Sequence, residues 1–211
     1  MRVLVFGASI TQGFWDSQGG WVQRLRAHYD TKQIKNLTQD NPTIFNLGIS
    51  ADTTEDILRR FENETKARAR KDMAFILTAG VNDAAIVAGQ ERSTTQKYKA
   101  QIEELIDKAK RYSPMVLCVG IGPCEERLTD PVPKYWHDDL RYTNEKLFKF
   151  EKIMRQVCAE EDIPHVAIFE TMQAEIAKGR ELLADGLHPN DAGHQLIFEL
   201  VRPKLDELLN T

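Results

Sequence analysis

The 211-residue sequence contains few cysteines and no long hydrophobic segment. Its three cysteines, Cys118, Cys124 and Cys158, are an odd number without the spacing of metal ligands, in a chain too long to need disulfides for stability. We therefore expect free thiols and a cytoplasmic protein. No apolar run approaches the roughly 20 residues that cross a bilayer, and the N-terminal apolar stretch is too short for a signal peptide. Stable membrane insertion is therefore not expected.

The sequence also lacks an excess of basic residues. Its 28 Lys and Arg residues and 32 Asp and Glu residues give a formal net charge of -4. The two signs alternate without forming a basic face, and the short basic run at residues 66–71 fits a solvated helix end, so no nucleic-acid partner is expected. Repeats and linkers are absent too, and the length suits one domain over residues 1–211.

Short apolar segments alternate with longer segments of helical periodicity, which is typical of β-α units around a parallel sheet. Strands are predicted at residues 2–6, 43–47, 73–78, 115–120 and 165–169. Helices are predicted around residues 21–29, 53–61, 98–109, 140–157 and 196–201. Because the strand segments are continuously hydrophobic, we expect them to be buried on both faces of the sheet.

The longest irregular stretch, residues 121–137, contains three prolines. It is compatible with a loop that determines specificity and equally with a plain surface connection. Four aromatic residues are open to two interpretations in the same way, as walls of a substrate cleft or as core packing. They are Phe14, Trp15, Trp21 and Trp136.

The first predicted strand ends in a glycine-bounded turn at residues 7–13, Gly-Ala-Ser-Ile-Thr-Gln-Gly. The dinucleotide fingerprint needs glycines where Ser9 and Gln12 stand, and the P-loop needs a Gly-Lys pair that is absent. The α/β-hydrolase elbow needs a second glycine where Thr11 stands. The turn can still expose the Ser9 hydroxyl at the carboxyl edge of the sheet as a nucleophile. Alone, Ser9 is also compatible with a helix cap.

Near the end of the chain, Asp185-Gly186-Leu187-His188-Pro189 precedes the last predicted helix. A serine becomes nucleophilic when a neutral imidazole takes its proton, and the imidazole needs a carboxylate at its other nitrogen. Asp185 and His188 can meet that need within one loop, although a turn former and a loop histidine would give the same motif. Asp191 is expected in the first turn of the helix. The remaining histidines are expected at surface or core positions: His28, His137, His165 and His194.

Polar groups also follow the second predicted strand, at Asn46-Leu47-Gly48, and the third, at Gly80-Val81-Asn82-Asp83. Gly48 lets a backbone N–H approach a ligand closely, and the Asn82 amide offers two donors; each is also compatible with an ordinary turn residue. Because parallel strands open on one edge, these donors are expected to meet Ser9 and the Asp185–His188 loop in one crevice.

Taken in order, these four segments resemble the SGNH hydrolase family, also called the GDSL esterases and lipases, over nearly the whole chain. The family is named for a serine, a glycine, an asparagine and a histidine, which fall here on Ser9, Gly48, Asn82 and His188. The resemblance implies an α/β fold, a flavodoxin-like three-layer α/β/α sandwich, here with a five-stranded parallel sheet.

By the same resemblance, Ser9 attacks an acyl carbon, His188 is the general base and Asp185 orients it. The backbone N–H groups of Ser9 and Gly48 and the Asn82 side chain would form the oxyanion hole. The implied activity is hydrolysis of a small-molecule carboxylic ester with a short acyl group, through an acyl-enzyme, without cofactor or metal. The acyl and alcohol groups and the oligomeric state stay open.

One position departs from the family pattern, because Ala8 stands where an aspartate is usual. The nucleophile is kept, but a hydrogen bond that shapes the turn is lost, which bears on rate and substrate preference. The alternative is a non-catalytic ligand-binding module that retains the fold, and Ala8 is its main support. A flavodoxin-like nucleotide-binding domain is disfavoured, because no phosphate-binding pattern is present.

Overall fold

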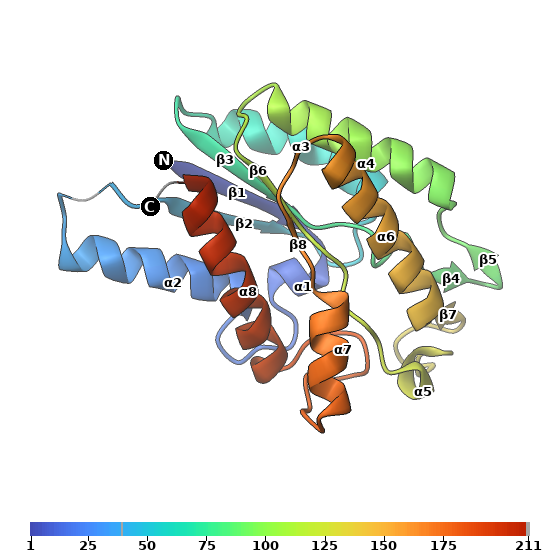
Figure 1. The fold of residues 1–211 in the computed structure, drawn as a ribbon. Coiled ribbons are helices and arrows are strands. Elements are labelled where there is room, and N and C mark those ends of the chain that lie inside the picture. The colour runs from blue at the N-terminus through green and yellow to red at the C-terminus, as the bar shows by residue number, and fades with distance from the viewer. Residues whose placement is uncertain (39, 210–211) are drawn as a thin grey trace.

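The computed structural model describes residues 1–38 and 40–209. Its centre is a parallel sheet of five strands in the spatial order β2-β1-β3-β6-β8. The strands are β1 (Arg2–Gly7), β2 (Thr43–Gly48), β3 (Met73–Leu77), β6 (Val116–Val119) and β8 (His165–Val166). Counted along the chain within this sheet, the order is 2-1-3-4-5, which is the flavodoxin-like order. The predicted fold is confirmed (Figure 1).

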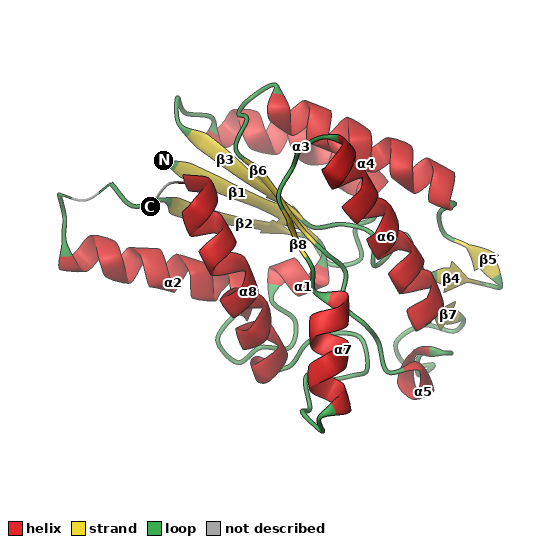
Figure 2. Ribbon diagram, in the orientation of Figure 1, coloured by secondary structure: helices red, strands yellow, loops and turns green. Residues whose placement is uncertain are grey.

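Helices cover both faces of this sheet (Figure 2). On one face lie α2 (Gly20–Lys35) and α8 (Asp191–Leu209). On the other lie α3 (Thr54–Arg68), α4 (Thr95–Lys110) and α6 (Asn144–Glu160). Three shorter helices are α1 (Ser9–Gln12), α5 (Glu126–Thr129) and α7 (Phe169–Ala177). The sheet is therefore the middle layer of a three-layer sandwich.

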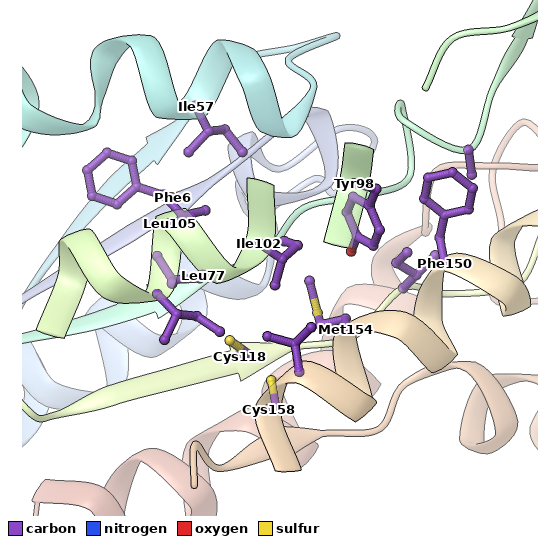
Figure 3. Packing of buried hydrophobic residues seen from close by; sticks show 14 of the residues in the cluster. Phe6, Ile57, Leu77, Tyr98, Ile102, Leu105, Cys118, Phe150, Met154 and Cys158 are labelled. Carbon is purple, nitrogen blue, oxygen red and sulfur yellow. The ribbon is translucent and has the colours of Figure 1, made fainter. Parts of the chain in front are cut away.

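The interior strand β1 supplies side chains to both hydrophobic cores, because successive residues of a strand point to opposite faces. Leu4 and Phe6 pack in the core under α3, α4 and α6, whereas Val3 and Val5 pack in the core under α2 and α8. Figure 3 shows the first of these cores, in which Cys118 and Cys158 also lie. All three cysteines are free and buried. Two packed cores thus hold the strands whose carboxyl ends carry the candidate site.

A second, antiparallel sheet was not predicted from the sequence. It consists of β4 (Ile86–Val87), β5 (Gln90–Glu91) and β7 (Leu140–Arg141), in the order β5-β4-β7. Strands of two residues are too short to show an alternation of apolar and polar side chains. This small sheet lies beside the N-terminal end of α6 (Figure 1).

Two predicted boundaries also differ from the structure. The strand predicted at 165–169 is shorter, because α7 already begins at Phe169. The helix predicted at 140–157 begins late, at Asn144, because the side chain of Thr143 caps it by accepting a backbone N–H of the first turn. Apolar runs alone do not separate a short buried strand from the start of a helix.

The last described helix, α8, runs from Asp191 to Leu209 without interruption and contains Pro203. It buries one face, including Leu196, Ile197 and Val201. Within residues 1–38 and 40–209, no helix combines the length and the apolar character that a bilayer span requires.

Candidate active site

Ser9 is the first residue of α1, and only Ala8 separates it from the carboxyl end of β1. The turn between them requires Gly7, because a Cβ there would collide with the hydroxyls of Thr11 and Thr78. Those two hydroxyls hydrogen-bond to each other at 2.8 Å beneath the turn. The local packing therefore fixes Ser9 at the carboxyl edge of the sheet, where its side chain is nearly buried.

His188 lies between Ser9 and Asp185. The distance from its Nε2 to Ser9 Oγ is 2.9 Å, and the distance from its Nδ1 to Asp185 Oδ2 is 2.7 Å. The other carboxylate oxygen, Oδ1, accepts the backbone N–H groups of Leu187 at 3.0 Å and of His188 at 2.8 Å. The structure thus brings together the serine, histidine and aspartate that the sequence predicts, in the order that a catalytic triad needs.

The Asp185 carboxylate is held in its charged form. Burial by itself raises the pKa of Asp185, but hydrogen bonds from the side chain and backbone of His188 and from the Leu187 N–H outweigh burial and keep the pKa well below its usual range. A further donor, the indole Nε1 of Trp15, lies 2.7 Å from Asp185 Oδ2. A carboxylate in this state stabilises an imidazolium at His188.

Asn82 faces the same site from the loop after β3 and is buried. Its Nδ2 donates to the carbonyl of Asp52 at 2.9 Å, and its Oδ1 accepts the hydroxyl of Tyr142 at 3.0 Å. One hydrogen of the amide is used by Asp52, so the second can serve a ligand. Burial raises the pKa of Tyr142 to about 12, so its hydroxyl stays a donor at neutral pH. Nothing in the sequence pattern pointed to Tyr142.

The structure corrects the predicted role of Gly48. Its N–H donates to Asn46 Oδ1 at 2.9 Å, and Asn46 Nδ2 donates in turn to the carbonyl of Thr11 at 2.8 Å. A Cβ on Gly48 would collide with the Gln12 backbone in α1. Gly48 is therefore a close-approach glycine, as its residue type suggested, but it approaches α1 and not a ligand.

Ala51 lies nearer the reacting groups and lines the same cleft as Ser9 and Asn82. Its φ of 66° is in the left-handed region, which an L-residue with a Cβ adopts at a cost. Its carbonyl accepts Arg92 Nη2 at 3.1 Å. Ala51 could not be identified from the sequence, because an alanine, unlike a glycine, does not indicate a left-handed turn.

An open cleft of about 780 Å³ contains the triad. Aromatic side chains wall it, and the ring centroids of Trp136 and Phe14 lie 5.3 Å and 5.7 Å from that of His188. Trp15 is 58% exposed and Tyr135 is 91% exposed. The irregular segment 121–137 thus contributes to the cleft through its last residues, including His137.

Trp21 belongs to the core, where it is 1% exposed. It also borders a second, smaller cavity of about 50 Å³, which Ser9 lines as well. The walls of this cavity are mainly apolar and include Ile121, Met172 and Ile197. Ser9 therefore lies at the junction of a small apolar cavity and a large open cleft.

Asp191 and His194 do not belong to the triad but hold the segment after α1. Asp191, the first residue of α8, accepts the backbone N–H of Ser17 at 2.8 Å and also its hydroxyl. His194 is buried and its Nε2 lies 2.6 Å from the carbonyl of Phe14. His165 pairs with the buried Glu151 at 3.3 Å. In the part of the chain that the structure describes, no three His, Cys, Asp or Glu side chains form a metal-binding group.

Comparisons with known proteins identify the family and the fold. A model of the GDSL-like lipase/acylhydrolase family matches residues 5–196. Among solved structures, a lipase/acylhydrolase from Enterococcus faecalis has a TM-score of 0.75 at 20% identity, covering 98% of this chain and 95% of that chain. The acetyl xylan esterase AlAXEase has a TM-score of 0.76 at 18% identity, covering 97% and 99%. An acetylxylan esterase from Geobacillus stearothermophilus has a TM-score of 0.73 at 18% identity, covering 97% and 93%.

These structural likenesses, all at low identity, concern the fold. A curated relative, the uncharacterized lipoprotein YqeF of Bacillus subtilis (strain 168), is 30% identical over 112 residues. That match covers 52% of this chain and 44% of the relative, so less than half of the longer protein is represented.

Proposed function

Because this chain belongs to the GDSL-like lipase/acylhydrolase family, we propose that it hydrolyses carboxylic esters with Ser9 as nucleophile. The observation that carries the proposal is the continuous hydrogen-bonded chain from Ser9 Oγ through the His188 ring to Asp185 Oδ2, with distances of 2.9 Å and 2.7 Å. An imidazole placed between a hydroxyl and a carboxylate can take the hydroxyl proton and remain oriented while it is charged.

In the first half of the reaction, Ser9 Oγ would bond to the acyl carbon while its proton moves to His188 Nε2. Asp185 would stabilise the resulting imidazolium. The imidazolium then returns the proton to the leaving alkoxide as the bond between the acyl carbon and the alcohol oxygen breaks. In the second half, water attacks the acyl-enzyme in the same way and releases the acid.

The negative charge that develops on the carbonyl oxygen needs donors that are free in the resting protein. We assign this role to the second hydrogen of the Asn82 amide and to the backbone N–H groups of Ser9 and Ala51. Ala51 replaces Gly48 in this proposal because it lines the cleft beside Ser9, whereas the Gly48 N–H is already bonded to Asn46. One such donor is typically worth a factor of about 10² to 10³ in kcat.

The two spaces beside Ser9 suggest which part of the ester lies where. The alcohol must leave from the side of His188, because that residue protonates it, and this side is the open aromatic cleft. The acyl group would then face the smaller, mainly apolar cavity of about 50 Å³. A cavity that holds a single water has a volume of about 10 to 15 Å³, so this cavity has room only for a short acyl group. An acetyl group on a bulky alcohol, as in the substrates named for the two acetyl xylan esterases, would suit this division.

The non-catalytic alternative rests on Ala8, which leaves α1 without a side-chain cap. We favour the enzyme, since the distances within the triad are those of good hydrogen bonds despite this change.

The test is turnover of p-nitrophenyl esters from acetate to octanoate, with Ser9→Ala as the matched control. We expect hydrolysis that is fastest for the shortest acyl groups and that Ser9→Ala abolishes. A serine-reactive phosphonate should add one equivalent to Ser9, as mass mapping of peptides would show. Labelling at another residue would remove Ser9 as nucleophile, and neither turnover nor labelling would favour the binding module.

A further inference from the structure

Asp185 Oδ2 accepts two side-chain donors at once. His188 Nδ1 and Trp15 Nε1 each lie 2.7 Å from it. The backbone N–H groups of Leu187 and His188 occupy Oδ1. A carboxylate has about four acceptor sites, so this one is fully used. Rotation of the carboxylate would break hydrogen bonds on both oxygens.

We propose that Trp15 is a positioning residue of the triad, and that its indole N–H fixes the Asp185 carboxylate so that Oδ2 faces His188. The inference rests on the ester hydrolysis proposed above. Backbone groups fix one oxygen of the carboxylate, but the other would otherwise be held only by the imidazole that it must orient. The indole N–H gives Oδ2 a second hydrogen-bond donor, and this donor does not change its protonation during the reaction.

The backbone that carries Trp15 is itself firmly held. On its C-terminal side, Asp16 accepts Arg24 Nε at 2.9 Å and the Gly20 N–H at 2.9 Å, both from α2. On its N-terminal side, the carbonyl of Phe14 accepts His194 Nε2 from α8. Burial lowers the pKa of His194, which favours the neutral ring whose Nδ1 accepts the backbone N–H of Trp21 at 3.3 Å. Trp15 is therefore presented to Asp185 from a fixed loop.

The indole is 58% exposed, so burial does not explain its position. Its ring stands edge-on to His188, at 6.3 Å between centroids and an angle of 81°, and it lines the open cleft. One face of Trp15 is thus available to the leaving alcohol while its N–H holds the carboxylate. The same side chain serves alcohol binding and triad alignment.

The first test compares indole-to-phenyl changes at two positions of the cleft. Trp15→Phe keeps a ring but removes the N–H, and we expect kcat for p-nitrophenyl acetate to fall about 3- to 10-fold, with KM within about 2-fold. Trp136→Phe makes the same change at the other cleft indole, which contacts the His188 ring, and should alter KM more than kcat. Equal kcat in Trp15→Phe and wild type would overturn the inference.

The second test repeats Trp15→Phe in an Asp185→Asn background, with Ser9→Ala rates subtracted as background. If Trp15 acts through the carboxylate, the loss in kcat should shrink to less than about 2-fold in this background. A loss of the same size in both backgrounds would mean that Trp15 acts by packing alone, which contradicts the proposal. Ser17→Ala, which removes the hydroxyl that donates to Asp191, should show a smaller loss with the same dependence on Asp185.

A third readout needs no turnover. In a ¹⁵N-labelled sample, the indole N–H signal that disappears in Trp15→Phe should be protected from solvent exchange in the wild type and lose that protection in Asp185→Ala. An unprotected Trp15 signal in the wild type would overturn the contact itself. A wild type without ester turnover would overturn the proposed function, and this measurement would still decide the contact.

Discussion

The two halves of the candidate active site differ in how completely their polar groups are satisfied. In the triad half, every acceptor of Asp185 has a donor before any substrate arrives. In the oxyanion half, Asn82 keeps one amide hydrogen for a ligand, and Ala51 carries backbone strain. The triad half is thus complete in the resting protein, whereas under the proposed mechanism the oxyanion half gains its partner only when charge develops in the transition state. Interactions made only then are the ones that raise kcat.

The largest effect should come from removing the charge of the triad half. Asp185→Asn keeps the shape of the side chain but no longer stabilises the imidazolium or selects the tautomer of His188, so kcat should fall roughly 10² to 10⁴-fold. Asp191→Asn is the matched control, because that carboxylate only holds Ser17 at the start of α8, and its kcat should change less than about 3-fold. Steady-state kinetics on variants checked by circular dichroism would decide; the larger loss in Asp191→Asn would exchange the two assignments.

Removing a donor from the oxyanion half should give the second-largest loss in kcat. Asn82→Ala removes a donor that meets charge only in the transition state, so kcat should fall roughly 10² to 10³-fold while KM moves little. Measuring kcat and KM separately checks this. A change confined to KM would make Asn82 a contact of the bound ester in its ground state, and the contrast between the two halves would be lost.

A smaller loss is expected when the support of Asn82 is removed. Tyr142→Phe deletes the hydroxyl that holds Asn82 Oδ1, and we expect kcat to fall roughly 3- to 10-fold, the size of one ordinary hydrogen bond. Tyr29→Phe deletes a hydroxyl that donates to Asp206 at 2.8 Å, between α2 and α8, and should lower the melting temperature while leaving kcat alone. A kcat loss in both variants would indicate a general loss of structure.

The smallest expected effect is on the free energy of unfolding, and it tests the backbone strain in the oxyanion half. Ala51→Gly relieves a left-handed alanine, and after the entropy that glycine adds to the unfolded chain we expect the free energy of unfolding to rise by about 0.5 to 1 kcal/mol. Ala88, with a φ of 51°, is the matched site outside the cleft, and Ala88→Gly should act alike. Chemical denaturation measures both. Destabilisation by Ala51→Gly alone would show that the Ala51 side chain contributes contacts that outweigh its strain.

The triad half could be predicted from the sequence because its signals are local. Asp185 and His188 are three residues apart in one loop. Ser9 closely follows a strand whose continuous hydrophobicity predicts that it is buried. The five parallel strands were found for the same reason, and their convergence then followed from the geometry of parallel sheets.

The oxyanion half and its surroundings could not be predicted in this way. Tyr142 reaches Asn82 across 60 residues of sequence, from a strand of only two residues. Gly48 was misassigned because a glycine signals a close approach without naming the partner, which turned out to be α1. Trp15 was recognised as a possible cleft residue, but a hydrogen bond to a residue 170 positions away leaves no periodicity or spacing to detect.

Several hydrogen bonds in and around the site join residues 9–29 to residues 185–206. They include Ser9–His188, Trp15–Asp185, Ser17–Asp191, Phe14–His194, Arg24–Gln195 and Tyr29–Asp206. In a growing chain, all five strands of the parallel sheet are synthesised before His188, because β8 ends at Val166. Contacts between such distant residues are slow to form, because a long loop must close before they stabilise anything. We therefore expect the Ser9–His188–Asp185 arrangement to form after the sheet and both cores have begun to form.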